Sequence, residues 1–391
     1  MTEVSLDAAE VRDCLVGTGT MLPAGAYTDE AVLAWELRFL LGGGWVCVGR
    51  SADVPRPRSR RAVPLGAPGA DGTVLLVRGE DGVLRGFHNT CRHRAHELLA
   101  CGETANSRFI TCPYHNWVFD LDGSLHKVPG EQRDELDADA FGLVPVSVGE
   151  WQGFVFVNAD GSAPPVAAYF TGLDERLAPY GIDRLIVAAE HEYELRANWK
   201  LAVENYHECY HCPSLHPQLC RVSPPDSGEL FASEGMWIGG NMALVDGAET
   251  MSVTGTSATG PMPGVHGGAL REVLYLQLVP TLLLSPNPDY VLVHLLQPVS
   301  AGLTRVRCQW LFPPEALARD GFDPAYAVQF WDITNRQDWA ACESVQRGVR
   351  SAGYRPGPLS ASHEDAVAQA IAVVARTYLD GRLPNTVHVK G

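Results

Sequence analysis

The stretch CRHRAHELLACGETANSRFITCPYH, residues 91–115, decides the fold of this chain. It holds two pairs of metal-binding side chains, Cys91-x-His93 and Cys112-x-x-His115, with eighteen residues between the pairs. Two thiolates and two imidazoles are a ligand set that holds a metal tetrahedrally. From these residues alone, a structural zinc site and an iron–sulfur cluster both remain open.

The sequence around the two pairs predicts an all-β domain over residues 45–160. Short alternating or β-branched runs, such as TVLLVRG at 73–79 and GFVFVN at 153–158, are typical of strands. Asp-Gly pairs at 71–72, 81–82 and 122–123 separate these runs and predict hairpin turns. Each Cys-His pair therefore falls on a loop between predicted strands, which makes a chance arrangement a poor explanation.

The rest of the chain predicts a second domain, of the α+β class, over residues 161–391. Its periodicity indicates helices at 199–210, 324–351 and 364–378, a hairpin formed by 274–285 and 290–299, and a further strand at 305–312. Residues 1–44 predict helices that pack on this domain. The segment 221–270 is rich in Gly, Ser, Thr and Pro, which is typical of a lid or pocket wall.

The segment ENYHECYHCPSLHP, residues 204–217, carries a second group of metal-binding side chains. His211 follows Glu208 by three residues, about one helical turn, so we expect the two side chains to face one another. His216 lies beyond Pro213. Two imidazoles and one carboxylate form the facial triad of non-haem Fe(II) oxygenases, which leaves coordination positions open for oxygen.

The carboxylate of such a triad must come from elsewhere in the chain. Asp338, in the segment NRQDW at 335–339, is our candidate, and Asp332 and Glu343 compete with it. Cys209 and Cys212 form a CxxC pair beside the histidines. We expect them to be packed thiols rather than a redox pair.

The segments CRHRAHEL and CPYHNWVFDLDGSL resemble the two cluster loops of Rieske [2Fe–2S] domains. The whole chain resembles the α subunits of Rieske non-haem iron oxygenases. NWKLAVENYHECYHCPSLHP and VQRGVRSAGYRPGPLS are similar to the carnitine, glycine betaine and stachydrine monooxygenases. The resemblance implies an N-terminal all-β Rieske domain and a helix-grip-like catalytic domain with a large antiparallel sheet and long helices. Ala95 and Asn116 depart from it, because the family usually has glycine there.

The resemblance also implies a role for each candidate residue. Cys91 and Cys112 would bind one iron of a [2Fe–2S] cluster, and His93 and His115 the other. His211, His216 and Asp338 would bind a mononuclear Fe(II). Glu208 would be the carboxylate that bridges the two metal centres, a position at which most members have Asp.

Composition excludes several classes of function. The chain has 391 residues, 46% of them hydrophobic and 19% charged, which is typical of a soluble globular protein. A net charge of −16 argues against nucleic-acid binding. No apolar run approaches the roughly 20 residues that span a membrane. Since the N-terminus shows no secretory signal, we expect a cytoplasmic protein whose cysteines are free thiols or metal ligands.

These features predict the oxygenase component of a Rieske system. It would use O2 and electrons from NAD(P)H to hydroxylate or N-demethylate a small polar substrate such as a methylated amine or betaine. An aromatic or natural-product scaffold is the alternative. The chain has no Gly-x-Gly-x-x-Gly fingerprint, so a separate flavin and iron–sulfur reductase is expected to bind the nicotinamide. The resemblance also implies a homotrimer.

Two other classes compete with the oxygenase. A Rieske electron carrier would use only the first 160 residues, and a zinc-stabilised binding protein would contain no iron. For the oxygenase, we expect the substrate pocket to draw on residues 221–270 and on strands around Tyr275, Gln277 and His294. Trp237 and Tyr275 are the aromatic candidates for contact with a quaternary nitrogen.

Overall fold

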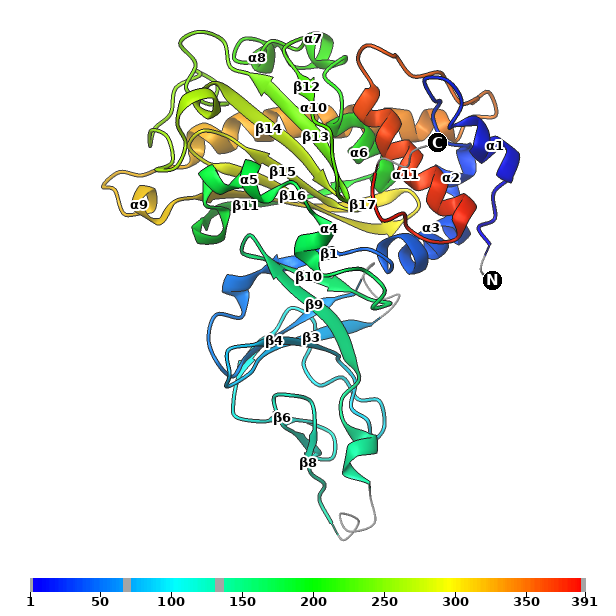
Figure 1. The fold of residues 1–391 in the computed structure, drawn as a ribbon, viewed down its shortest axis with the longest axis vertical. Coiled ribbons are helices and arrows are strands. Elements are labelled where there is room, and N and C mark those ends of the chain that lie inside the picture. The colour runs from blue at the N-terminus through cyan, green and yellow to red at the C-terminus, as the bar shows by residue number, and fades with distance from the viewer. Residues whose placement is uncertain (1–2, 66–71, 131–136, 388–391) are drawn as a thin grey trace. The chain divides into compact units, whose positions relative to one another are not determined.

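The computed structural model describes residues 3–65, 72–130 and 137–387. The chain divides into two compact units (Figure 1). The smaller unit is formed by Gly42–Val166. The larger unit is formed by Met1–Leu41 together with Ala167–Gly391, so the N-terminal helices belong to the same unit as the C-terminal half.

The smaller unit is built from two antiparallel sheets, as the alternating runs predict. A seven-stranded sheet has the order β1-β10-β9-β4-β3-β2-β5, and a three-stranded sheet has the order β6-β7-β8. Gly82 and Gly123 of the predicted Asp-Gly turns have positive φ, whereas the pair at 71–72 lies partly outside the described residues. The strands are β1 Val46–Arg50, β2 Ser59–Pro64, β3 Thr73–Arg78, β4 Leu84–His88, β5 Thr104–Asn106, β6 Ile110–Thr111, β7 Val118–Phe119, β8 Leu125–Lys127, β9 Pro145–Trp151 and β10 Phe154–Asn158.

The larger unit contains a seven-stranded antiparallel sheet in the order β11-β17-β16-β15-β14-β13-β12. The predicted hairpin is present, but the run 274–285 forms two strands rather than one. Pro280 has no N–H to continue a ladder, and the chain turns there. The strands are β11 Ile186–Leu195, β12 Glu229–Leu230, β13 Trp237–Ala243, β14 Glu272–Leu278, β15 Leu282–Pro286, β16 Val291–Ser300 and β17 Leu303–Phe312.

Helices of this unit pack on one face of the sheet. The predicted helix 199–210 ends early, at Tyr206, because the Glu208 carboxylate accepts the His211 backbone N–H at 3.0 Å and thereby competes with a continued helix. The main helices are α1 Ala8–Asp13, α2 Ala24–Thr28, α3 Glu30–Glu36, α6 Trp199–Tyr206, α10 Ala325–Val349 and α11 Asp365–Asp380. Shorter ones are α4 Val166–Tyr169, α5 Asp174–Leu177, α7 Cys212–Leu215, α8 Pro217–Cys220 and α9 Pro314–Leu317.

Strand register decides which side chains face these helices. Gly240 lies opposite Tyr275, and Leu283 lies opposite both Gln277 and His294. Because side chains two residues apart on a strand share a face, Tyr275, Gln277 and His294 all point to the same side of the sheet. Helix α10 lies on that side, since its Asn335 hydrogen-bonds His294.

Buried polar contacts join the N-terminal helices to the rest of the larger unit. Glu36 of α3 accepts a hydrogen bond from Lys200 Nζ at 2.6 Å and another from Trp199 Nε1 at 2.9 Å. Tyr378 of α11 also donates to Glu36. An ion pair as buried as Glu36–Lys200 needs further hydrogen bonds to its charged groups. Trp199 and Tyr378 donate such bonds to the Glu36 carboxylate.

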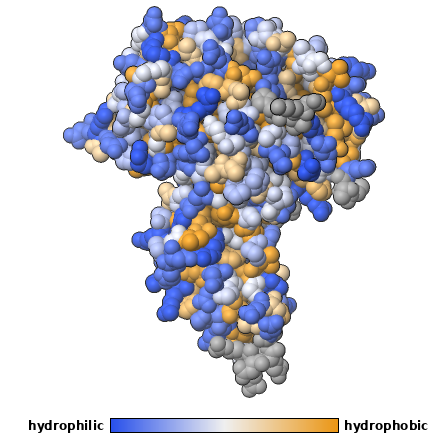
Figure 2. All heavy atoms as spheres, in the orientation of Figure 1, coloured by the Kyte–Doolittle hydropathy of each residue, from blue (hydrophilic) through white to orange (hydrophobic). Residues whose placement is uncertain are grey.

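The surface is mixed in polarity. Figure 2 shows hydrophilic residues interspersed with hydrophobic ones on the face in view. Among the described residues, no helix is both long enough and apolar enough to span a bilayer.

Candidate metal centre

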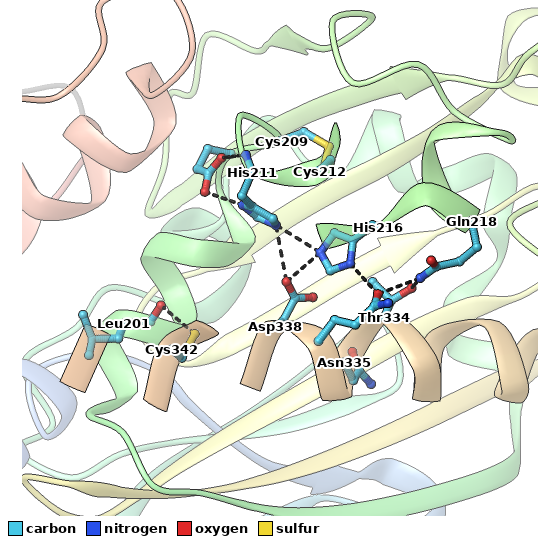
Figure 3. Close-up of polar contacts among 12 residues, drawn as sticks. Leu201, Cys209, His211, Cys212, His216, Gln218, Thr334, Asn335, Asp338 and Cys342 are labelled. Carbon is cyan, nitrogen blue, oxygen red and sulfur yellow. Dashed lines mark hydrogen bonds and ion pairs between the residues drawn. A yellow bond between two sulfur atoms is a disulfide. The ribbon is translucent and has the colours of Figure 1, made fainter. Parts of the chain in front are cut away.

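Three of the predicted ligands meet at one point in the larger unit (Figure 3). His216 Nε2 lies 2.8 Å from Asp338 Oδ1, and His211 Nε2 lies 3.3 Å from the same oxygen. The two Nε2 atoms are 3.2 Å apart. His211 comes from the turn before α7, His216 from the turn after it, and Asp338 from the middle of α10. These three atoms can therefore coordinate a single ion.

Hydrogen bonds fix the protonation of both imidazoles. His211 Nδ1 contacts the Glu208 carboxylate, and His216 Nδ1 lies 2.7 Å from Gln337 Oε1. The Gln337 oxygen faces the ring because it also accepts from Gln218 Nε2 at 2.8 Å. Because each Nδ1 faces an acceptor, a proton on that nitrogen is satisfied, and each Nε2 is the nitrogen available to bind a metal.

The electrostatics of this group favour a positive charge at its centre. Burial alone would lower the pKa of His211, but hydrogen bonds to Asp338 and Glu208 raise it to about 9. Burial would raise the pKa of Asp338, but hydrogen bonds from His211 and His216 lower it. His216 is 1% exposed and Asp338 15% exposed. A divalent cation would replace the protons that these groups hold when no metal is bound.

The competing carboxylates on α10 lie elsewhere. Asp332 accepts from the Tyr193 hydroxyl at 2.8 Å and pairs with Arg336. Glu343 accepts the backbone N–H of Arg196. Of the three candidates, only Asp338 lies within reach of both imidazoles.

The interpretation of Cys209 and Cys212 as packed thiols is wrong, because the structure joins them in a disulfide. The two residues do not share one helix, since α6 ends at Tyr206, before Cys209, and Cys212 is the first residue of α7. The intervening turn brings their Cα atoms to 4.9 Å, within the range that a disulfide requires. This disulfide encloses Tyr210 and His211 on the same turn.

A cavity of about 360 Å³ opens beside the three converging ligands. Its volume lies in the range of small-molecule sites. Residues of 225–242 form part of its wall, as the sequence predicts, and the strands contribute Tyr275, Leu283 and His294. Helices and their ends contribute Tyr206, Glu208, Tyr210, Trp331, Thr334, Asn335, Asp338, Trp339, His363 and Asp365.

Two residues expected in the pocket lie outside it. Gln277 shares the face of Tyr275 but hydrogen-bonds His207 at 2.7 Å and the Pro280 carbonyl, so it does not line the cavity. Trp237 is 1% exposed and donates its Nε1–H to Thr171 O at 2.8 Å. Trp237 precedes Ile238 on the strand and so points away from the face that holds the cavity.

The Cys-His pairs of the smaller unit lie on two loops whose side chains approach one another. Cys91 and Cys112 are buried in one hydrophobic cluster and hydrogen-bond each other, and burial raises the pKa of Cys91 to about 11. The rings of His93 and His115 are 4.7 Å apart. His115 Nδ1 is buried and has no hydrogen-bond partner among the residues that the structure describes. Two adjacent buried thiols and an orphaned imidazole nitrogen fit an iron–sulfur cluster.

The two departures from the family pattern keep the backbone that glycine would adopt. Ala95 has φ 57° and Asn116 has φ 56°, both in the left-handed region. Each closes its loop with a backbone hydrogen bond of 3.0 Å, Ala95 to Cys91 O and Asn116 to Cys112 O. Asparagine tolerates this conformation well, whereas alanine does so at a cost of about 1–2 kcal/mol.

Comparison with known families agrees with this arrangement. A family described as "Rieske [2Fe-2S] domain" matches residues 44–148, and one described as "Ring hydroxylating alpha subunit (catalytic domain)" matches residues 182–380. The chain belongs to the Rieske oxygenase α subunits. It is therefore an oxidoreductase, and the two matched domains imply a [2Fe–2S] cluster and a mononuclear iron.

Individual relatives indicate the branch of this family to which the chain is similar. The glycine betaine monooxygenase oxygenase subunit of Chromohalobacter salexigens is 31% identical over 95% of this chain and 89% of its own. The carnitine monooxygenase oxygenase subunit of Escherichia coli K12 is 32% identical over 85% of each. The structure of a quaternary ammonium Rieske monooxygenase superposes with a TM-score of 0.79 at 28% identity, covering 95% of this chain and 99% of that one.

Sequence reasoning missed several residues of the site. Gln337 and Gln218 orient His216, and Asn335 holds His294. Gln337 directly precedes Asp338, so adjacency to a candidate ligand was the available signal. Gln218 gave no signal, because only the tertiary structure brings it to α10.

Proposed function

We propose that this Rieske oxygenase hydroxylates or oxidatively N-demethylates a small methylated amine or betaine. The observation that carries the proposal is the charge of the cavity. Its described lining residues include five carboxylates and no lysine or arginine: Glu208, Asp226, Glu229, Asp338 and Asp365. A wall of this kind favours a cationic substrate.

Aromatic side chains of the same cavity support a cationic substrate. The Tyr206 and Tyr275 rings are 5.9 Å apart, and Trp331 lies 6.4 Å from Tyr275. A quaternary ammonium carries no N–H, so aromatic faces rather than hydrogen-bond acceptors are its usual partners. Relatives named for glycine betaine and carnitine add independent support.

The converging side chains are proposed to hold the two metal groups. His211, His216 and Asp338 would bind the mononuclear iron, and Cys91, His93, Cys112 and His115 the cluster. When bound, the iron supplies the activation of O2 as co-substrate. The protein residues keep the Nε2 lone pairs free for the metal, since Glu208 and Gln337 hold the Nδ1 protons. The wall that the strands and α10 form beside these ligands would orient the substrate.

The stoichiometry of the overall reaction determines how many electrons and protons must be supplied. One oxygen atom enters a C–H bond and the other leaves as water, which consumes two electrons and two protons. If the carbon is an N-methyl group, the product is a hemiaminal that releases formaldehyde. The electrons would come from NAD(P)H through a separate flavin and iron–sulfur reductase.

We further propose that electrons pass between subunits of a homotrimer. A related structure is described as giving insight into inter-subunit electron transfer. The Glu208 side chain is 14% exposed, and its two oxygens contact the ring and backbone of His211. His115 of the next copy would hydrogen-bond the same carboxylate, because an imidazole bound to a cluster needs an acceptor for its other N–H.

A substrate panel tests the proposed reaction. The holoenzyme, supplied with a surrogate reductase and NADH, should oxidise at least one of choline, glycine betaine and L-carnitine, with formaldehyde as product where demethylation occurs. Aromatic acids should give no product. Turnover of an aromatic acid with no turnover of any amine would overturn the proposal.

Glu208→Gln tests the proposed bridge. The variant keeps the shape of the side chain but removes the charge that holds both imidazoles. We expect it to retain its iron and a reducible cluster, yet to lose at least about 90% of turnover. The reason is that a positioned charge such as the Glu208 carboxylate contributes several kcal/mol to catalysis. Turnover close to that of the wild type would contradict the bridging role.

A further inference from the structure

Three polar atoms that belong to side chains of the cavity have no hydrogen-bond partner within the described part of the chain. They are Tyr275 Oη, His294 Nδ1 and Trp339 Nε1, and all three are buried. An unpaired buried polar atom costs about 1–3 kcal/mol. Such atoms in a binding cavity are groups that a ligand is expected to satisfy.

The hydrogen bonds of Asn335 determine which nitrogen of His294 carries the proton. The Tyr193 hydroxyl donates to Asp332 at 2.8 Å, and its oxygen has His191 Nδ1 at 3.2 Å and the Asn335 amide as neighbours. Burial raises the pKa of Tyr193 and the hydrogen bond from Asn335 lowers it, so the Asn335 nitrogen faces the Tyr193 oxygen. Asn335 Nδ2 also points to Cys308 Sγ, at 3.6 Å. The Asn335 oxygen therefore faces His294 Nε2, at 3.1 Å, and Nε2 is the nitrogen that donates.

His294 Nδ1 is consequently an acceptor without a donor. The ring is 4% exposed, and burial lowers its pKa to about 4, so the ring is neutral near pH 7. Its single proton lies on Nε2. The unpaired Tyr275 Oη and Trp339 Nε1 groups are donors, but neither lies within hydrogen-bond distance of His294 Nδ1.

We propose that His294 Nδ1 accepts a hydrogen bond from a hydroxyl group of the substrate, so that this enzyme selects quaternary ammonium compounds that carry a hydroxyl. The inference rests on the proposed function for the quaternary nitrogen and adds the hydroxyl. Choline and L-carnitine have such a donor. Glycine betaine and γ-butyrobetaine have none, because their nitrogen is fully methylated and their carboxyl group is ionised.

The enzyme discriminates against a substrate without a hydroxyl because that substrate leaves His294 Nδ1 unpaired. A substrate without a donor buries Nδ1 with no partner and also displaces any water that occupied the site. A site built to bond a substrate hydroxyl rejects an analogue that lacks it far more strongly than an apolar pocket rejects a missing methylene. We expect a preference of about tenfold or more in both Kd and kcat/KM.

Two matched pairs of ligands test this preference in the holoenzyme. Choline and ethyltrimethylammonium differ only in a hydroxyl, as do L-carnitine and γ-butyrobetaine. Calorimetric titration gives the ratio of dissociation constants within each pair, independently of turnover. The hydroxylated member of at least one pair should bind about tenfold more tightly to the wild type.

Three variants test whether His294 Nδ1 causes the difference in dissociation constants within each pair. His294→Phe removes the acceptor and should bring the ratio to within about twofold of unity. His294→Asn keeps an acceptor oxygen close to the position of Nδ1 and should retain most of the preference. Tyr275→Phe removes a donor from the same cavity, and we expect it to weaken both members of a pair alike.

The other possible results distinguish the proposed role of His294 from the proposed substrate class. Equal binding within both pairs by the wild type overturns the role of His294 and leaves the quaternary ammonium substrate standing. If no quaternary compound binds, mandelate and phenylacetate provide an aromatic pair that differs in one hydroxyl. A preference for mandelate that His294→Phe abolishes would support the role of His294 and reject the proposed substrate class, and equal or absent binding would reject both.

Discussion

At the scale of single residues, the metal site depends on the hydrogen-bond acceptors that orient its two histidine rings. His211 and His216 each use one nitrogen for Glu208 or Gln337, and this leaves the other nitrogen for a metal. Because imidazole has two nitrogens and one proton, the acceptor on one side determines the chemistry on the other. His294 follows the same rule through Asn335.

Replacement of Asp338 tests the assignment of the mononuclear site. Asp338→Ala should lose about one of the roughly three irons expected per chain, while the visible spectrum of the cluster persists. The change removes the anionic oxygen that lies 3.3 Å from His211 Nε2 and 2.8 Å from His216 Nε2. Iron analysis with a sulfide assay measures the result. Asp332→Asn is the matched control on the same helix and should keep its full iron content.

Burial of His294 predicts a dependence of stability on pH. Its pKa is about 4 in the folded protein, below the ordinary value of about 6.5. The unfolded chain therefore binds more protons between these values, and the free energy of unfolding falls as the pH decreases from about 6.5 to 4. This histidine contributes about 1.4 kcal/mol per pH unit in that window.

Urea unfolding of the wild type and of His294→Asn at pH 7 and at pH 5 measures this contribution. The difference in stability between the two proteins should shift in favour of the variant at the lower pH. A difference that does not change with pH would show that folding does not lower the pKa of His294.

At the scale of elements, the edge of the sheet forms a wall of the cavity through close backbone contact. Gly240 of β13 lines the cavity and pairs with Leu230 of β12. A Cβ atom at Gly240 would overlap the carbonyl group of Glu229. The two strands lie this close only because no side chain separates them.

Gly240→Ala should therefore push β12 away from β13 and open the cavity. We expect a loss of about 1–3 kcal/mol in stability, as for other overpacked sites, and a higher KM with an unchanged cluster spectrum. Gly348→Ala on α10 is the matched control, because a Cβ atom there meets no neighbour within 4 Å. The control should leave both quantities unchanged, and a similar loss in both variants would contradict the explanation.

At the scale of the whole molecule, the proposed transfer between subunits can be tested by mixing defects. Cys112→Ser removes a cluster ligand and Asp338→Ala removes an iron ligand, so each homotrimer should be inactive. In each trimer that contains both variants, one of the three head-to-tail contacts joins an intact cluster to an intact iron, so about a third of wild-type activity should return. Co-expression and purification through two tags measures it. No activity in the mixed trimers would place both centres in one subunit.

The sequence by itself determined the parts of this protein whose chemistry is local. The Cys-His pairs indicated a metal site, the Asp-Gly turns a β-rich unit and the segment 204–217 a second group of metal ligands, because ligand types and turn residues act over short spacings. The choice of a Rieske cluster over zinc came from the resemblance to a family. The long helix α10 followed from its periodicity. Identification of Asp338 over Asp332 and Glu343 still required the resemblance to a family.

Only the tertiary structure decided which distant residues share the cavity. Strand register and the turn at Pro280 put Tyr275 and His294 beside α10 and placed Gln277 beyond the cavity. The disulfide of Cys209 and Cys212 required the early end of α6, which depends on a side-chain contact of Glu208. The contacts of Tyr275, Gln277 and His294 are set by packing between elements far apart in the chain, and such packing leaves no periodic signal in the sequence.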